Sequence, residues 1–94
     1  MATRILVVED EPGIADAVTY TLRTEGMEVT WCTTAREARN LLTGGRFDLL
    51  VLDIGLPDEN GFDFCRDLRK SSAIPVIFLT ARTAEVDRVV GLEI

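Results

Sequence analysis

Short apolar runs alternate along this chain with segments whose apolar residues recur every three or four positions. Three runs, at residues 4–8, 48–53 and 75–79, consist largely of apolar residues, which is typical of strands covered on both faces of a parallel sheet. A further run at residues 28–33 alternates only weakly and predicts a strand nearer an edge. This regular change of period predicts a doubly wound α/β fold with helices on both faces of the sheet.

Capping residues support the helices that are predicted where apolar residues recur every three or four positions. Pro12 suits the first turn of one helix, and Gly26 suits a left-handed position just after its end. Thr34, followed three residues later by Glu37, has the pattern of a capping box at the start of a second helix. Helices are therefore expected at residues 12–25, 35–43, 62–70 and 85–92.

Composition excludes several classes of function. The 94 residues carry a net charge of −6, so a general affinity for nucleic acid is not expected. No apolar run approaches the ~20 residues that a membrane-spanning helix needs. The chain has no His, which excludes His-based catalysis and His-ligated zinc. Its two cysteines, Cys32 and Cys65, are too few for a disulfide scaffold and fit a reducing, cytosolic compartment.

Acidic and hydroxyl residues stand at the carboxyl ends of the predicted strands. Glu9 and Asp10 follow the first strand, Asp53 ends the third and Thr80 follows the fourth. Doubly wound sheets bind ligands at this edge, so the three carboxylates are expected to converge. Such a cluster raises a pKa or recruits a cation, and oxygen ligands suit Mg²⁺. A carboxylate beside Mg²⁺ can also act as a nucleophile in phosphoryl transfer. The Thr80 hydroxyl could then donate to a phosphoryl oxygen, and the small Ala81 would leave room for that group.

Each of these residues also has a simpler interpretation. Acids are common at solvated strand ends and at helix N-termini, and a Thr after a strand is often a helix cap. Trp31 is interpreted as packing in the core or on a strand face. The hypothesis of a site therefore depends on four residues sharing one edge of the sheet.

The chain resembles the receiver domain of bacterial response regulators over its whole length. The resemblance is carried by VVEDE at residues 7–11, LVLDIGLP at residues 50–57, Gly61, and FLTA at residues 78–81. It implies a flavodoxin-like α/β/α fold around a parallel sheet of strand order 2-1-3-4. It also implies one receiver domain over residues 1–94, most similar to those joined to a winged-helix DNA-binding output domain.

The resemblance implies a role for each matching residue. Asp53 corresponds to the phosphoacceptor, Asp10 to a direct ligand of Mg²⁺ or Mn²⁺, and Glu9 to a ligand that acts through water. The backbone carbonyl of Gly55 corresponds to a further metal ligand, and Thr80 to a hydroxyl that turns toward the phosphoryl group. The residues that shape the loop over the site correspond to Pro57 and Gly61.

These roles imply a function for the chain. Asp53 would accept a phosphoryl group from a sensor histidine kinase in a Mg²⁺-dependent reaction, and the parent protein would switch a transcriptional output. The chain would be a cytoplasmic signalling switch and not an enzyme. It would make no direct contact with nucleic acid or membrane.

One departure from the family pattern concerns a lysine. Family members carry a Lys on a fifth strand that pairs with the phosphoryl group, whereas the only Lys here is Lys70, after the third predicted helix. The chain is therefore expected to be a receiver that lacks the fifth strand and helix and has no output domain. Phosphorylation should be weak or absent, Mg²⁺ binding should persist, and self-association is expected through the uncovered edge Pro75–Leu79 or an uncovered sheet face.

Three other functions stay open. A phosphatase of the haloacid-dehalogenase type would also use an Asp nucleophile and Mg²⁺, but it needs a second Asp where Gly55 stands. A flavin or dinucleotide site would need a Gly-rich or hydroxyl-rich loop after the first strand, where acids stand instead. A non-catalytic interaction module of the same fold would leave the acids as solvated strand ends.

Overall fold

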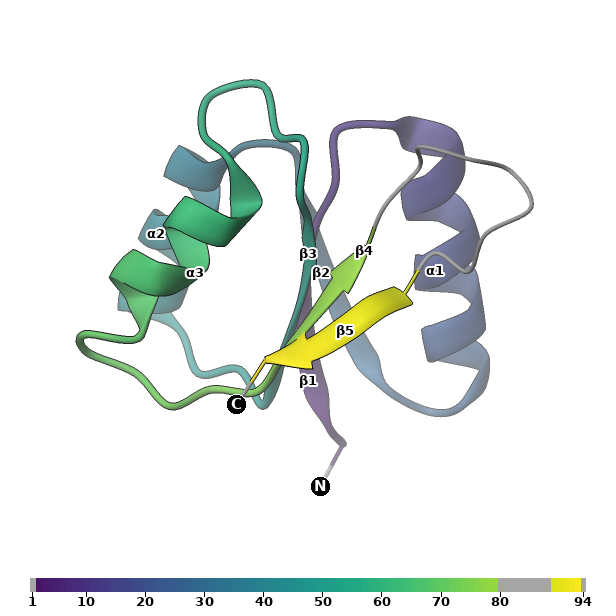
Figure 1. Cartoon of the computed structure of the whole chain (residues 1–94). Helices are drawn as coiled ribbons and strands as arrows, with labels where there is room; N and C mark the ends of the chain where they lie inside the picture. Colours follow the sequence, from purple (N-terminus) through teal and green to yellow (C-terminus); the bar gives the residue numbers. More distant parts are fainter. Residues whose placement is uncertain (1, 80–88, 94) are drawn as a thin grey trace.

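The computed structural model, which describes residues 2–79 and 89–93, contains one sheet in the order β2-β1-β3-β4-β5 (Figure 1). Four of its strands are parallel, and their pairing confirms the predicted order 2-1-3-4. Because β1 and β3 lie in the middle of the sheet, their carboxyl ends meet at one edge. The parallel strands are β1 (Arg4–Val8), β2 (Glu28–Cys32), β3 (Leu49–Asp53) and β4 (Val76–Leu79).

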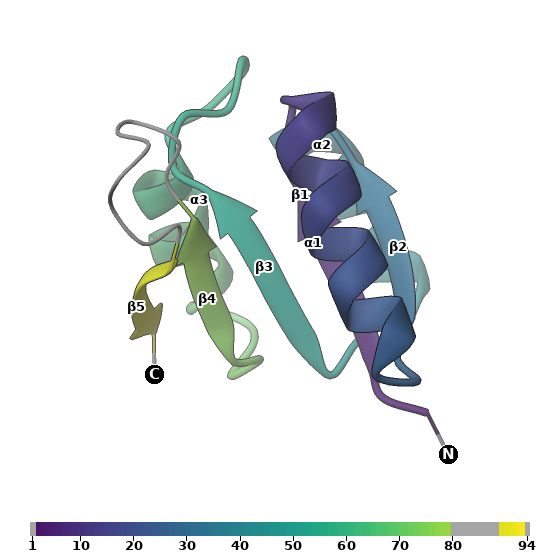
Figure 2. The same ribbon diagram turned by 90° about the vertical axis from the view of Figure 1, so that its right-hand side faces the viewer.

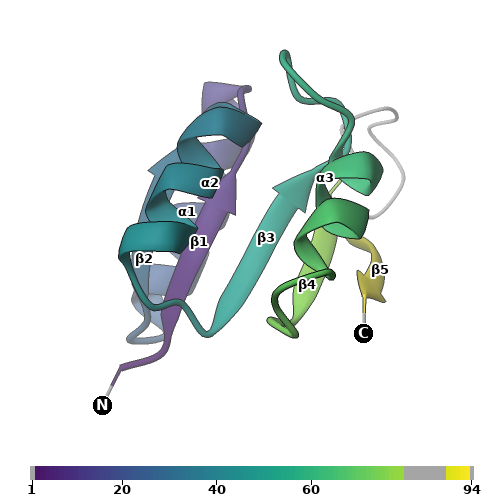
Figure 3. The ribbon, with the colours of Figure 1, turned by 90° about the vertical axis from the view of Figure 1, so that its left-hand side faces the viewer.

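Helices cover both faces of the sheet, as the α/β/α architecture requires. Helix α1 (Pro12–Thr24) lies on one face, in front of β1 and β2 in Figure 2. Helices α2 (Ala35–Gly44) and α3 (Gly61–Leu68) lie on the opposite face, which Figure 3 shows. The first three predicted helices are therefore confirmed, with ends that differ by one or two residues, as helix ends commonly do.

The predicted capping residues explain where these helices begin and end. Pro12 occupies the first turn of α1, and Gly26 adopts φ +84° after its end, in the left-handed region where a Cβ is disfavoured. The Thr34 hydroxyl accepts from the backbone N–H of Glu37 at 3.1 Å. The Glu37 carboxylate accepts in return from the backbone N–H of Thr33 at 3.2 Å, so the capping box closes one residue earlier than its usual form.

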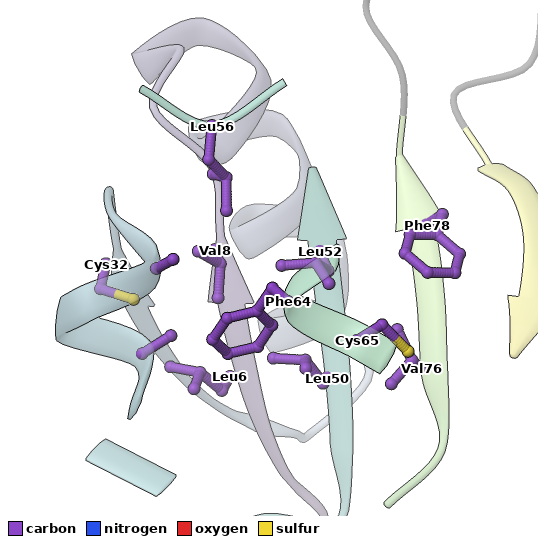
Figure 4. Close-up of a cluster of buried hydrophobic side chains, with 12 residues drawn as sticks. Leu6, Val8, Cys32, Leu50, Leu52, Leu56, Phe64, Cys65, Val76 and Phe78 are labelled. Carbon is purple, nitrogen blue, oxygen red and sulfur yellow. The ribbon is translucent and has the colours of Figure 1, made fainter. Parts of the chain in front are cut away.

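Successive residues of each central strand point into different cores. Ile5, Val7 and Val51 pack with α1 on one face. Leu6 and Val8 point to the other face, where the side chains shown in Figure 4 pack around Phe64 of α3. The central strands are thus apolar on both faces, which explains their uniform sequence.

The C-terminal prediction is wrong in its described part. Residues 89–92 were expected in a helix over 85–92, but β5 (Val89–Glu93) is a strand that pairs antiparallel with β4. The adjacent β-branched Val89 and Val90 favour a strand, and Gly91 weakens a helix. Pairing also satisfies the backbone groups along the outer side of β4. Residues 85–88 of the predicted helix lie outside the described residues.

The same pairing corrects the expected edge of the sheet. Residues 75–79 were predicted to be an uncovered edge, whereas β4 is hydrogen-bonded to β3 on one side and to β5 on the other. The outer edge on this side is therefore β5. Among the described helices, none combines the length and the apolar character needed to cross a membrane.

Candidate functional site

Three carboxylates meet at the carboxyl edge of the two central strands, the upper edge in Figure 1. Each of Glu9, Asp10 and Asp53 offers an oxygen, and these oxygens all lie within 4.8 Å of one another. The register pairs Val8 with Leu52, so Glu9 and Asp53, which follow them, lie at the same level along the sheet. The convergence expected from the sequence is therefore present in the structure.

Burial makes this cluster electrostatically costly. Glu9 is only 1% exposed and Asp53 only 7% exposed, whereas Asp10 is exposed. Loss of hydration raises the pKa of Glu9 to about 7, and the neighbouring charges of Asp53 and Asp10 act in the same direction. Burial also raises the pKa of Asp53, although a hydrogen bond from the Gly55 backbone opposes this rise.

The hydrogen bonds of Glu9 test whether the cluster fits a cation. Its Oε2 accepts from the backbone N–H of Glu11 at 3.0 Å. Its Oε1 is buried without a hydrogen-bond partner among the described residues. A buried anionic oxygen with no donor is rare in proteins, and its burial costs free energy unless a proton or a cation compensates it. The three carboxylates therefore fit an oxygen-coordinated divalent ion.

The loop from β3 to α3 has a shape that only Gly61 permits. The Gly61 N–H donates to the Ile54 carbonyl at 2.7 Å, and Gly55 and Asn60 form an isolated antiparallel bridge. A Cβ on Gly61 would lie 2.8 Å from the Ile54 Cα and would also overlap the Asp53 carbonyl oxygen. The tight return of the chain here thus requires glycine directly beside the backbone of Asp53.

Side chains after Pro57 attach this loop to α2, a link that sequence analysis missed. The Asp58 carboxylate accepts from the backbone N–H groups of Ala35 and Arg36, at 2.9 and 3.0 Å. These bonds hold the pKa of Asp58 below its usual range. Asp58 thus caps a helix that precedes it in the chain, an arrangement with no local sequence signal.

Arg39 of α2 reinforces the same link. Its guanidinium pairs with Glu59 of the loop at 2.5 Å and with Asp67 of α3 at 3.1 Å. It also lies 4.7 Å from the centre of the Phe64 ring. The loop, α2 and α3 are therefore held together by one network of charged side chains.

Trp31 also contacts residues 9–11, the acidic turn that follows β1. Sequence analysis did not anticipate this contact. Its side chain is 40% exposed, and its indole N–H donates to the backbone carbonyl of Glu9 at 2.7 Å. Of the two interpretations of Trp31, packing in the core is therefore wrong, and packing on a strand face omitted its hydrogen bond. Two other predicted site residues, Thr80 and Ala81, lie outside the described residues.

Comparisons of the sequence with known proteins agree with this geometry. Residues 5–94 match the response regulator receiver domain family. The chain is 44% identical over 92 residues to the sensory transduction protein RegX3 of Mycobacterium tuberculosis, covering 98% of this chain and 40% of that protein. It is 44% identical over 93 residues to the DNA-binding response regulator MtrA of Mycolicibacterium smegmatis, covering 99% and 41%. The chain thus spans about two fifths of the length of these relatives.

Solved structures agree as well. The non-phosphorylated HemR receiver domain of Leptospira biflexa superposes with a TM-score of 0.75 at 42% identity, covering 85% of this chain and 65% of that one. The response regulator TrrA of Thermotoga maritima, solved in complex with Mg²⁺ and BeF, gives a TM-score of 0.80 at 35% identity, covering 86% and 71%. With a matching sequence, a shared strand order and an acidic cluster at the expected edge, the chain belongs to the receiver domain family of two-component response regulators.

Proposed function

We propose that Asp53 accepts a phosphoryl group from a sensor histidine kinase in a Mg²⁺-dependent reaction. The observation that carries this proposal is the convergence of Glu9, Asp10 and Asp53 at the carboxyl edge of β1 and β3. The name of the similar protein MtrA, a DNA-binding response regulator, supports a transcriptional output for a longer protein that contains this chain. Exchange with such a kinase would take place in the cytoplasm.

In the proposed reaction, an Asp53 carboxylate oxygen attacks the phosphorus of the donor. A new P–O bond forms as the P–N bond to the kinase histidine breaks, and the imidazole leaves with the electron pair of that bond. A bound Mg²⁺ would neutralise the carboxylates and the phosphoryl oxygens. Asp10 and Asp53 would hold it directly, Glu9 through water and Gly55 through its carbonyl.

The proposal extends to two residues outside the described part of the chain. The Thr80 hydroxyl would donate a hydrogen bond to a phosphoryl oxygen, and the small Ala81 would leave space for that group. Pro57 and Gly61 would maintain the loop from which the Gly55 carbonyl reaches the ion. These roles rest on the family resemblance of their motifs.

Phosphorylation with a small donor tests this function. The chain would be incubated with acetyl phosphate and Mg²⁺, and intact mass would be followed over time. We expect a slow gain of one phosphoryl group, abolished by EDTA and by Asp53→Asn. The rate should be low because the only lysine, Lys70, lies after α3 beside Asp67. A modification that persists in Asp53→Asn would assign the acceptor to another residue, and rapid labelling would contradict the need for a lysine.

Self-association is a second part of the proposal. With β4 paired on both sides, the surface that we propose for this contact is a groove of about 310 Å³ between α1 and the sheet. Its lining is almost wholly apolar: Ala17, Val18, Thr21, Leu22, Leu49, Val51, Ile77 and Leu79. Light scattering over a concentration series should show association that Ile77→Asp prevents. A strictly monomeric, folded protein at all concentrations would refute it.

A further inference from the structure

We propose that Trp31 is a positioning residue for the acidic turn, because its indole N–H fixes the peptide plane from which Glu9 and Asp10 reach the cation. This inference deepens the proposed function and rests on it. It concerns the backbone carbonyl of Glu9, and it requires no titration of the carboxylates. Trp31 itself would touch neither the ion nor the phosphoryl group.

The position of Trp31 follows from the register of the sheet. It lies on β2 opposite Val7 of β1, on the same face as Val29. The next pair along the strands is Val8 with Cys32, and the Glu9 N–H then donates to the Cys32 carbonyl at 3.0 Å. The ladder therefore extends to the N–H of Glu9.

Beyond that bond, β2 departs from β1 to start α2. The Thr33 N–H donates to Glu37 at 3.2 Å as part of the helix cap. The Glu9 carbonyl receives the Trp31 indole N–H at 2.7 Å. A side-chain donor on β2 thus continues the attachment of Glu9 where the backbone of β2 has turned away.

This hydrogen bond controls more than one atom because the peptide unit is planar. The carbonyl of Glu9 shares its plane with the N–H of Asp10 and with the Cα atoms of both residues. A fixed oxygen therefore limits rotation of the whole unit that carries the two carboxylates. The Glu9 side chain is held separately by the Glu11 N–H, so the turn is held at three points.

The consequence is a defined contribution to cation affinity. Without the indole N–H, the Glu9–Asp10 peptide would sample other orientations, and cation binding would have to restrict them. The loss of one hydrogen bond of ordinary net strength corresponds to about a fivefold decrease in affinity. Trp31 is the single tryptophan of the chain, so analogues incorporated biosynthetically replace this side chain alone.

The experiment compares the unmodified whole chain with four altered forms by calorimetric titration with Mg²⁺. Benzothienylalanine in place of tryptophan keeps the ring size and removes the N–H donor, and Trp31→Phe serves as an independent variant. 5-Fluorotryptophan retains the N–H and is the rescue form. Tyr20→Phe, which alters another exposed aromatic residue, is the matched control.

We expect about fivefold weaker Mg²⁺ binding for the two forms without the donor, and unchanged binding for the rescue form and the control. Urea unfolding without Mg²⁺ separates positioning from stability, since a merely structural role would lower the unfolding midpoint and leave the affinity of the folded protein unchanged. Equal affinity in all forms would overturn the inference while leaving the proposed function intact. If the unmodified chain bound no Mg²⁺, the proposed function would fail and this inference with it.

Discussion

Substitution of Glu9 by Gln is expected to stabilise the chain above pH 6 when no divalent cation is present. Glu9 is 1% exposed, and burial raises its pKa from an ordinary value near 4.5 to about 7. The folded state therefore retains a proton that the unfolded state loses. The resulting stability is fully present below pH 4.5 and is lost as pH rises toward 7. At about 1.4 kcal/mol per pKa unit, the whole shift corresponds to about 3 kcal/mol.

Urea denaturation in EDTA, followed by circular dichroism from pH 5 to pH 8, measures this effect. The unfolding free energy of the unmodified chain should fall by up to about 3 kcal/mol over this range. Because Gln is neutral and of similar size, Glu9→Gln should remove most of the fall and separate the two midpoints at pH 8 by about 1 to 3 M urea. Glu25→Gln, at an exposed site after α1, is the control.

Two results would refute this reasoning. Stability of the unmodified chain that is constant or rising between pH 5 and 8 would mean that Glu9 is not destabilised by its surroundings. Equal pH profiles for Glu9→Gln and the unmodified chain would assign the effect to another group. Mg²⁺ should stabilise the unmodified chain at pH 8 more than the variant, since binding to the folded state shifts the equilibrium.

Three further substitutions test the loop and its attachment. Gly61→Ala places a Cβ 2.8 Å from the Ile54 Cα and should lower the unfolding free energy by about 1–3 kcal/mol, whereas Gly44→Ala, with open space around its Cβ, should not destabilise. Asp58→Ala removes the two hydrogen bonds that Asp58 adds to the Thr34 cap of α2, and it should cost about 1 kcal/mol at pH 7. That contribution should disappear on acidification, because the pKa of Asp58 is depressed and its stabilisation is lost as pH falls through the folded value. Arg39→Met should lower the unfolding free energy by less than about 1 kcal/mol, and this decrease should be smaller in high salt, as expected of half-exposed ion pairs. Thermal melts compare the four variants with the unmodified chain.

The elements up to β4 could be predicted because their sequence signals are local and agree with one another. Uniform apolar runs, Pro12, Gly26 and the Thr34 cap each specify a conformation within a few residues. The segment after β4 carries weaker signals, since a short apolar pattern fits either period. Its strand depends on pairing with β4, which is a tertiary contact that periodicity does not encode.

In the candidate site, too, some features could be predicted from the sequence and others could not. The convergence of Glu9, Asp10 and Asp53 could be predicted because strand order alone brings the ends of β1 and β3 together. The roles of Trp31 and Asp58 could not, because each side chain bonds to the backbone of a different element. Such contacts depend on the distance between packed elements and on the direction in which a side chain turns. Neither quantity follows from the pattern of apolar and polar residues along the sequence.

The acids stand on the two strands that are least able to separate. β1 is hydrogen-bonded to β2 and β3, and β3 to β1 and β4, with packed cores on both faces. Two carboxylates about 4 Å apart repel by about 4 kcal/mol at an effective dielectric of 20. Because the sheet does not let the strand ends move apart, the repulsion is relieved by a proton on Glu9 or by a bound cation. The same rigidity that destabilises the cation-free protein at neutral pH therefore favours cation binding, and the pH profile of stability and the Mg²⁺ affinity should change together in variants of Glu9.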